Sequence, residues 1–420
     1  MNDMEQNKKT PQVRFKGYND AWEQRKVGEL VVKHNAGIYI SKEDYGSGTN
    51  VIGVGNIYDN DIFDGEIYKL GPVSDSKFLL EENDLVYGES SLVPEGIART
   101  VCVGKNGAGS AFAWHTRRVK VNQNNVNSHF ATLELNYHPE VRKYLMSVST
   151  QTALTGMTTE GYFGATLLLP TVEEQNKISS LFKRIDHLIT LHQRKYDKLI
   201  NVKQAMLEKM FPKNGSLYPE IRFEGFTDAW EQRKLGKLGT LKNGMNFSQE
   251  AMGVGFPFVN LQNIFGNNVI NVNDLGLAMA SEAQLKDYNL LEGDVLFVRS
   301  SVKLEGVGEA ALVPINLENT TYSGFIIRFR DEYGLDKNFK RFIFCIDSIR
   351  SQIMSQATNS ANKNISQSVL ENLDLKIPCK NEQVKIGKYF SNLDYLITLH
   401  QRKLKKLKNI KKSCLEKMFV

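Results

Sequence analysis

The sequence has few cysteines and no long apolar run. Its 420 residues include four cysteines, and no two of these stand at the C-x-x-C spacing that binds zinc or cycles a disulfide. A chain so poor in cysteine is typical of a reducing compartment, so we expect a cytoplasmic location. No stretch approaches the roughly 18 consecutive apolar residues of a membrane span, and the first residues are polar. The sequence therefore predicts a soluble, unexported protein with no membrane partner.

The motifs of common catalytic sites are also missing. The sequence has no G-x-x-x-x-G-K-[ST] nucleotide loop, no H-E-x-x-H zinc motif and no G-x-G-x-x-G that opens a helix after a strand. It contains no E-x-K, the usual nuclease pair, and no [DN]-P-P-[FY], the segment that holds the exocyclic amine in amino-methyltransferases. We therefore expect no catalytic residues, no metal site and no cofactor in this chain.

What is present is enough apolar material for folded domains. Hydrophobic residues make up 41% of the chain and aromatic residues 10%, which argues against wholesale disorder. At roughly 150 residues per domain the length predicts two or three domains. The net charge of +6 permits a nucleic-acid partner without demonstrating one.

An internal repeat organises the whole chain. Residues 11–30 return at 219–238 with 13 of 20 identical, and residues 173–212 return at 381–420 with 23 of 40 identical. Both matches have an offset of 208, which indicates a tandem duplication. Residues 31–170 and 239–378, which lie between the matched segments, share only fragments. The duplicated frame therefore predicts one scaffold that carries two different specificities.

Two segments predict long helices that pair as a coiled coil. Apolar residues recur every 3.5 positions from Ile178 to Met210 and again from Ile386 to Met418, without an internal proline. Both apolar stripes are interrupted at equivalent positions. We interpret the interrupting residues as setting the pairing register, since a shifted pairing would bury them without partners. These register residues are His192, His400, Lys203 and Lys411.

The expected fold is α+β. We predict two strand-rich mixed α/β modules joined by two long helices packed as an antiparallel coiled coil, with an internal pseudo-two-fold axis. The expected parts are a leading segment 1–30, a first module 31–170, a first helix 171–211, a linker with the repeated leading segment 212–238, a second module 239–378 and a second helix 379–420.

Polar loops of the two modules are the candidate DNA contacts. Short β-type runs alternate with loops rich in Ser, Thr, Asn and Gln, side chains that match the donors and acceptors of base edges. The modules are acidic, with net charges of −4 for 31–170 and −3 for 239–378, whereas the helices are basic. The candidates are Asn56, Ser90, Ser91, Thr155, Thr158, Thr159 and Tyr162 in the first module, and Gln262, Asn263, Arg299, Ser300, Ser301, Lys303, Asn359, Asn362, Lys363 and Asn364 in the second.

These residues together resemble the specificity subunit of type I restriction-modification systems. The resemblance rests on the duplicated W-E-x-x-[KR]-[LV]-G-x-L segments at Trp22 and Trp230, the GD[IV]L-like strands followed by Ser-Ser, and the P-x-x-x-E-Q start of each long helix. The first module has Glu89 where the second has Arg299, so a basic contact at Arg299 is not carried over to Glu89.

The resemblance implies a non-catalytic reader of double-stranded DNA. Each module would bind one half of an asymmetric, bipartite target, and the helices would set the spacer and dock two methyltransferase (modification) subunits. Those partners would bring S-adenosylmethionine and methylate adenine, and two ATP- and Mg-dependent restriction subunits would complete the endonuclease. From the residues alone two alternatives stay open: a coiled-coil assembly protein that does not read DNA, and a DNA-modifying enzyme with an unrecognised active site.

Overall fold

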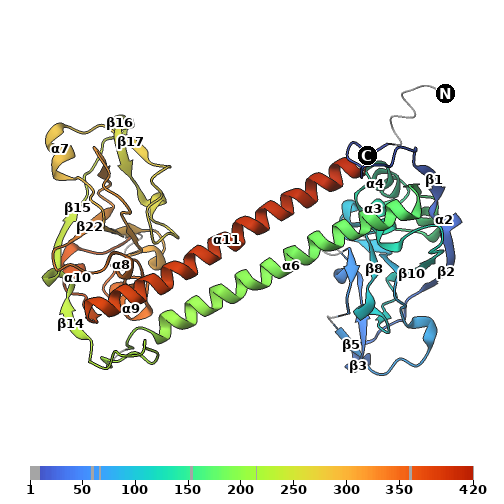
Figure 1. Cartoon of the computed structure of the whole chain (residues 1–420), viewed down its shortest axis with the longest axis horizontal. Helices are drawn as coiled ribbons and strands as arrows, with labels where there is room; N and C mark the ends of the chain where they lie inside the picture. The colour runs from blue at the N-terminus through green and yellow to red at the C-terminus, as the bar shows by residue number, and fades with distance from the viewer. Residues whose placement is uncertain are drawn as a thin grey trace. The chain divides into compact units, whose positions relative to one another are not determined.

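The computed structural model describes residues 10–57, 61–65, 68–151, 155–213, 215–358 and 362–419. These residues form two compact units. The described residues of Met1–His192 and Lys403–Val420 make up unit 1, and those of Gln193–Arg402 make up unit 2. Each unit mixes helices and strands, as the composition predicts (Figure 1).

Unit 1 holds thirteen strands in its described part. They are β1 (Glu23–Lys26), β2 (Val31–Ala36), β3 (Tyr45–Ile52), β4 (Ile62–Phe63), β5 (Tyr68–Leu70), β6 (Leu85–Gly88), β7 (Ser90–Ser91), β8 (Thr100–Val103), β9 (Ala111–Phe112), β10 (Thr116–Val121), β11 (Thr150–Gln151), β12 (Thr155–Gly156) and β13 (Thr166–Leu169). Its shorter helices are α2 (Val27–Leu30), α3 (Ser128–Tyr137), α4 (Pro139–Ser147) and α5 (Thr159–Phe163).

Unit 2 repeats this series with small differences. Its strands are β14 (Glu231–Lys234), β15 (Gly239–Asn243), β16 (Met252–Val259), β17 (Gly276–Ala278), β18 (Val295–Val298), β19 (Ser300–Ser301), β20 (Ala310–Leu312), β21 (Thr321–Tyr322), β22 (Ile326–Asp331), β23 (Lys363–Asn364) and β24 (Asp374–Ile377). Its shorter helices are α7 (Glu282–Asp287), α8 (Lys337–Ile343), α9 (Asp347–Ser355) and α10 (Gln367–Glu371).

A twisted, mainly antiparallel sheet lies at the centre of each unit. Its strand order is β2-β10-β6-β8-β4 in unit 1 and β15-β22-β18-β20 in unit 2. The central strands β6 and β18 are buried along their whole length, which explains why both sequences read as continuous apolar runs. A second, three-stranded sheet follows the same plan in both units, as β5-β3-β9 and β17-β16-β21. The two modules therefore share a topology although their sequences diverge.

The long helices α6 (Val172–Lys209) and α11 (Lys380–Met418) each contribute to both units. Unit 1 contains the first half of α6 and the last part of α11, whereas unit 2 contains the first half of α11 and the last part of α6. Within each unit the two helices therefore run antiparallel. The positions that repeat every 3.5 residues from Ile178 to Met210 and from Ile386 to Met418, including the interrupting histidines and lysines, are all buried or half-buried, as the period predicts. The predicted fold class is confirmed.

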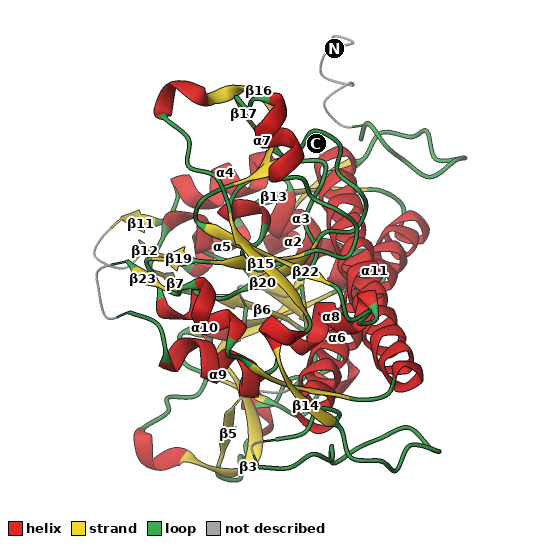
Figure 2. Cartoon of the chain, turned by 90° about the vertical axis from the view of Figure 1, so that its left-hand side faces the viewer, coloured by secondary structure: helices red, strands yellow, loops and turns green. Residues whose placement is uncertain are grey.

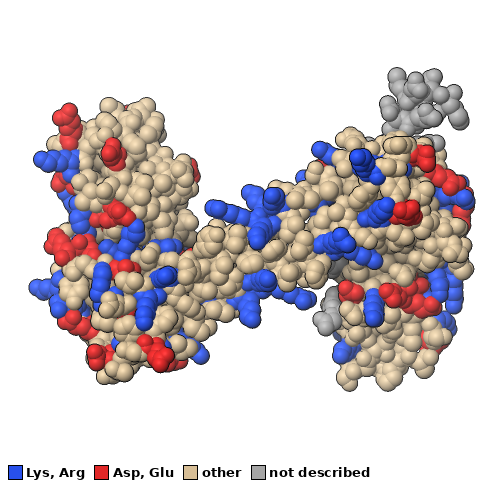
Figure 3. All heavy atoms as spheres, viewed as in Figure 1, with Lys and Arg blue, Asp and Glu red and all other residues tan. Residues whose placement is uncertain are grey.

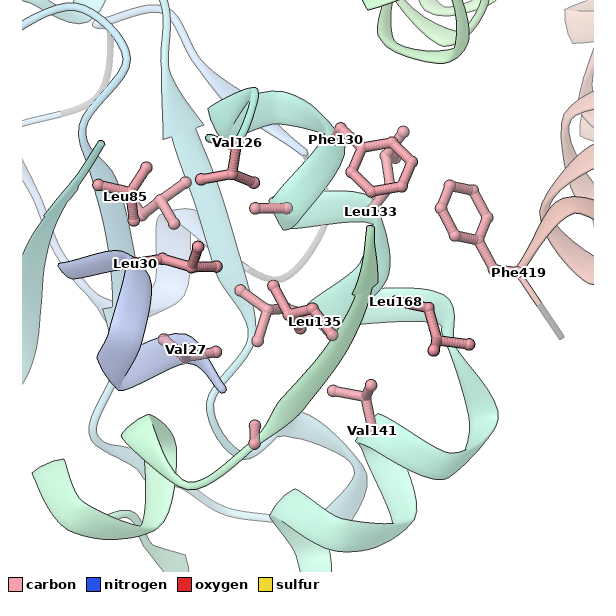
Figure 4. Close-up of a cluster of buried hydrophobic side chains, with 14 of the residues drawn as sticks. Val27, Leu30, Leu85, Val126, Phe130, Leu133, Leu135, Val141, Leu168 and Phe419 are labelled. Atoms are coloured by element: carbon pink, nitrogen blue, oxygen red, sulfur yellow. The ribbon is translucent and has the colours of Figure 1, made fainter. Parts of the chain in front are cut away.

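A phenylalanine near the end of each long helix enters the core of a module. In unit 1 the Phe419 ring lies 5.8 Å from Phe130 of α3 and 5.9 Å from Phe182 of α6, measured between ring centroids. Figure 4 shows Phe419 pointing from the end of α11 toward Phe130. In unit 2 the equivalent Phe211 lies 5.8 Å from Phe339. The repeated Met-Phe at the helix ends is therefore an anchor for the antiparallel pair.

The repeated Glu-Gln at the start of each helix is structural. The Glu174 carboxylate is buried and accepts two hydrogen bonds from Arg14, at 2.7 and 2.8 Å, and Glu382 binds Arg222 at the same distances. Such bidentate pairs combine charge with fixed geometry. They tie the leading segment of each repeat to the helix that follows its module.

Candidate nucleic-acid interface

The two polar segments of each module meet at a short strand beyond the central sheet. In unit 1 β7 pairs with β12, with Ser91 opposite Thr155. In unit 2 β19 pairs with β23, with Ser300 opposite Asn364 and Ser301 opposite Lys363. Figure 2 shows each of these small sheets on the side of its own unit that lies away from α6 and α11. Sequence-distant candidates are thereby brought together in each unit.

One residue before the short strand fixes it to the central sheet in the same way in both units. The Glu89 N–H donates to the His115 carbonyl, and the Glu89 carbonyl accepts from the Met157 N–H. The Arg299 backbone makes the corresponding two bonds to Phe325 and Ile365. The side chains differ: Glu89 forms an ion pair with Arg117, and Arg299 is half-buried beside the Gly324 carbonyl. The same backbone therefore presents different chemistry.

The second serine of each Ser-Ser pair braces the following turn. The Ser91 hydroxyl accepts from the Val93 N–H at 3.2 Å and donates to the Val93 carbonyl at 2.7 Å. The Ser301 hydroxyl accepts from the Lys303 N–H at 3.2 Å. Such turns set the backbone of the next two residues. Ser91 is only 2% exposed, so its prediction as a DNA contact is corrected to a role in the turn.

Other candidates of unit 1 also lie in the interior. Tyr162 is fully buried, its ring stacks on Tyr87 with centroids 3.8 Å apart, and its hydroxyl bonds to Thr100 at 2.9 Å. Burial raises the pKa of Tyr162 far above its usual value. Thr155 is 5% exposed. Because these side chains serve the core, neither can touch DNA without rearrangement, and both predictions are corrected.

Two asparagines predicted as contacts cap their own loops. The Asn56 Oδ1 accepts from the Gly53 N–H at 2.7 Å. The Asn263 Oδ1 accepts from the Asn260 N–H at 2.8 Å, and its Nδ2 donates to the Asp274 carbonyl at 2.7 Å. Both side chains are buried. Their amides are used inside the loop, so these two predictions are corrected as well.

The remaining candidates reach the surface to different degrees. Thr158 is exposed and caps α5 by accepting from the Gly161 N–H at 3.0 Å. Three side chains of unit 2 are exposed: Gln262, Lys303 and Asn362. Ser90, Thr159, Lys363 and Asn364 are half-buried, and Ser300 is 9% exposed at the edge of the hollow described next. Asn359 lies outside the described residues.

Apolar side chains around the short strands were missed by the sequence analysis. Leu92 and Val302 follow the Ser-Ser pairs and are 84% and 79% exposed. In unit 2, Phe265 and Phe325 help to line a hollow of about 530 Å³ together with Lys303 and Asn362. Hydrogen-bonding capacity marks a residue in the sequence as a candidate base contact, and these apolar side chains have none. The alternation of apolar and polar residues along a strand does not reveal that a single leucine after the strand is exposed.

The register lysines are ion-paired within their units. In unit 2 the Lys203 ammonium lies 2.6 Å from Asp394 of α11, and in unit 1 Lys411 lies 2.8 Å from Asp186 of α6 and 3.0 Å from Asp61. Burial by itself lowers the pKa of Lys411, but the Asp61 charge and the Asp186 hydrogen bond raise it overall, so the amine stays charged. Each pair joins α6 to α11, which supports the predicted register role of the lysines. His192 and His400 are half-buried, and their register role stays a prediction.

Positive charge gathers on the long helices. Figure 3 shows Lys and Arg side chains standing along them with few acidic neighbours. Exposed Lys405, Lys408 and Lys412 of α11 fall on one helix face. Asp197 and Ile200 occupy the first two of the equivalent positions in α6. The basic character is therefore stronger on α11.

The described part of the chain offers no metal centre or membrane span. Among the described residues, no three His, Cys, Asp or Glu side chains come together as ligands for a metal ion. None of the helices in the described ranges combines the length and apolar character needed to cross a bilayer.

A duplicated frame that presents two different polar surfaces defines a two-module recognition protein. Residues 19–201 and 227–409 both match the family of type I restriction modification DNA specificity domains, and the chain belongs to this family. The two matched ranges are again offset by 208 residues at both ends. The resemblance of the leading segments, strands and helix starts is confirmed.

Individual relatives agree with the family. The chain is 26% identical over 263 residues to the type I restriction enzyme EcoKI specificity subunit of Escherichia coli, covering 60% of this chain and 56% of the relative. It is 24% identical over 196 residues to a putative type I restriction enzyme MjaX specificity subunit of Methanocaldococcus jannaschii, covering 45% of each. The chain thus spans about half the length of the curated relatives it matches. The fold is similar to the crystal structure of a type I restriction-modification S subunit from M. genitalium, with a TM-score of 0.62, 14% identity, and coverage of 98% of this chain and 99% of that one.

Proposed function

We propose that this chain is the non-catalytic DNA-recognition subunit of a type I restriction-modification complex. Each module would read one half of an asymmetric, bipartite target. The observation that carries the proposal is the short strand pair of each unit, β7 with β12 and β19 with β23. Glu89 and Arg299 make the same backbone hydrogen bonds before these strands but have side chains of opposite charge, and Thr155 and Gly156 of β12 correspond to Lys363 and Asn364 of β23. A shared frame with exchanged surface chemistry is what two unlike half-sites require.

The chemistry of these strands suits base edges. The major groove admits a two-stranded β-ribbon, and its bases offer donors and acceptors to Ser, Thr, Asn and Lys side chains. Unit 2 presents Lys303, Lys363 and Asn364 around β19 and β23, whereas unit 1 presents Ser90, Thr158 and Thr159. The modules can read bases although their net charge is negative, because the phosphate contacts that add affinity can come from other parts of a complex.

The long helices fit a shared docking role. Their sequences are identical at 23 of 40 positions, and two identical methyltransferase subunits need two equivalent surfaces. In this proposal the helices also set the length of the unread spacer. S-adenosylmethionine, ATP and Mg belong to the two methyltransferase and two restriction subunits, and the assembly works on DNA in the cytoplasm.

A module exchange tests the proposal. Residues 239–378 are replaced by the corresponding module of another specificity subunit, and the target of the assembled complex is mapped from its methylated adenines. We expect one half-site to change while the other half-site and the adenine modification persist. The matched exchange of residues 31–170 should change only the other half. A change in both halves, or in neither, contradicts the proposal.

A second assay separates this function from an enzyme with an unrecognised site. The purified chain alone is incubated with DNA and S-adenosylmethionine, and methyl transfer is measured. No transfer is expected until the methyltransferase subunits are added. Turnover by the chain alone would overturn the non-catalytic role, and a partnered complex that binds all DNA sequences equally would favour a pure assembly protein.

A further inference from the structure

The most exposed large apolar side chain of each unit occupies the same place. Leu92 is 84% exposed and Val302 is 79% exposed, and no other large apolar side chain in the described part of either unit is as exposed. A single exposed apolar residue needs no explanation. Here, however, the position recurs in two modules whose sequences otherwise diverge, directly after β7 and directly after β19.

The backbone under these two side chains is held firmly. Ser91 braces the turn that carries Leu92, and Ser301 braces the turn that carries Val302. A short 3-10 turn follows at once in both units, Pro94–Gly96 and Leu304–Gly306. Because this backbone is already ordered, burying the side chain against a ligand adds only the cost of fixing the side-chain rotamer and no large backbone ordering cost.

Polar side chains lie next to both tips. Leu92 follows Ser90 and Ser91 of β7. Val302 lines the hollow of unit 2 together with Ser301, Lys303 and Asn362, and Leu261, Phe265 and Phe325 line the same hollow. An exposed apolar tip that stands next to hydroxyl groups, and in unit 2 also next to a lysine and further apolar side chains, suits a ligand surface that combines hydrogen-bonding groups with isolated methyl groups.

The major groove of DNA is such a surface. Its base edges offer hydrogen-bond donors and acceptors, and the C5-methyl group of thymine is the apolar feature that side chains contact there. We propose that Leu92 and Val302 are specificity-determining residues, each packing on the C5-methyl group of one thymine in the half-site read by its own unit. This inference rests on the proposed function and adds one defined base contact per half-site.

The test compares duplexes that differ by one methyl group. Each thymine of the mapped target is replaced singly by deoxyuridine, and the affinity of the assembled complex is measured with the wild-type chain, with Leu92→Ala and with Val302→Ala. With the wild-type chain we expect one thymine in each half-site whose replacement weakens binding about fourfold, the effect of burying one methyl-sized group. Leu92→Ala should lose this sensitivity in one half-site only, and Val302→Ala in the other only.

A matched control uses another exposed apolar residue of unit 1. Val32 is 65% exposed on β2, and Val32→Ala should respond to deoxyuridine as the wild-type chain does. The inference is overturned if Leu92→Ala and Val302→Ala keep the full wild-type response at every thymine. It is also overturned if they weaken binding equally on all duplexes, which is the behaviour of a wedge between base steps. A wild-type complex without sequence preference would instead refute the proposed function itself.

Discussion

Glu134 lies in the core of unit 1 with no exposed surface. One carboxylate oxygen accepts the Leu168 N–H at 3.1 Å, and within the described residues the other oxygen has no hydrogen-bond partner. Burial raises the pKa of Glu134 to about 8, so the side chain is largely protonated at neutral pH. The unit 2 residue at the same distance from the helix N-cap is Ile343. Burial, and not the residue type, decides the charge of this glutamate.

Replacing Glu134 by glutamine should flatten the pH dependence of stability. The pKa of Glu134 is higher in the folded state than in the unfolded state. Between about pH 4.5 and about pH 8 the carboxyl therefore ionises in the unfolded state and stays protonated in the folded state, so the stability of the wild type falls as the pH rises through this range. Relative to the wild type, Glu134→Gln should therefore gain stability across this window, by on the order of 4 kcal/mol at pH 9. Urea unfolding at a series of pH values measures the difference. The exposed Glu140→Gln should show no such trend, and a pH-independent difference for Glu134→Gln would contradict the prediction.

The two long helices are joined by equivalent ion pairs with unequal surroundings. Lys203 and Lys411 are related by the 208-residue offset, as are their partners Asp394 and Asp186. Unit 1 adds Asp61, which is 4% exposed and also contacts Lys411. Unit 2 adds Arg341, which lies 3.0 Å from Asp394. In unit 1 the contact between the two helices therefore includes a second, buried carboxylate, Asp61, whereas in unit 2 it includes a second cation, Arg341.

This difference predicts unequal effects of removing the two lysines. Lys411→Met leaves the buried Asp61 carboxylate with Arg99, at the longer distance of 3.8 Å, in place of the ammonium at 3.0 Å, which should destabilise unit 1 by roughly 3 kcal/mol. Lys203→Met leaves Asp394 still paired with Arg341 and should destabilise unit 2 by about 1 kcal/mol. Denaturant unfolding, with a probe in each unit, measures both. Adding Asp61→Asn to Lys411→Met should restore most of the loss, and failure of this rescue would show that charge burial is not the cause.

At the scale of the whole molecule, both long helices pass from one unit into the other. Each module packs against the first half of the helix that follows it and the last part of the other helix. The segments on either side of His192 and Arg402 belong to different units. A change in helix length at these two points leaves the contacts within each unit intact, so it can test whether the helices set the spacer.

Three heptads inserted into each helix at these points should lengthen the preferred spacer by about ten base pairs. Twenty-one residues add about 32 Å, close to the roughly 34 Å of one DNA turn, so both half-sites keep their rotational phase. One inserted heptad should instead bring the half-sites out of phase and weaken binding to targets of every spacer length. Both variants are tested by selecting bound DNA from a library of targets with different spacer lengths. An unchanged spacer preference would contradict the proposal that the helices set the spacer.

Patterns that depend on neighbouring positions were predictable. The 3.5-residue period predicted the two long helices, because periodicity reflects which helix face is buried, and the 208-residue offset predicted the two related modules. Neither pattern fixes the direction of pairing, and the antiparallel expectation is met in the structure, where Lys203 contacts Asp394 and Lys411 contacts Asp186. Contact residues were less predictable. Tyr162, Asn56 and Asn263 have suitable chemistry for base recognition, yet the structure uses them in the core or in loop caps.

The sequence by itself determined the duplicated architecture and the family, since both follow from motifs that occur twice in the chain although the modules between them differ in sequence. Only the tertiary structure decided which polar groups face solvent, because the sequence does not distinguish a serine that hydrogen-bonds within a turn from a serine that is exposed to a DNA base. Tertiary packing buried Ser91 and left Leu92 projecting. That outcome depends on the pairing of β7 with β12, two strands far apart in the chain, which no local pattern specifies.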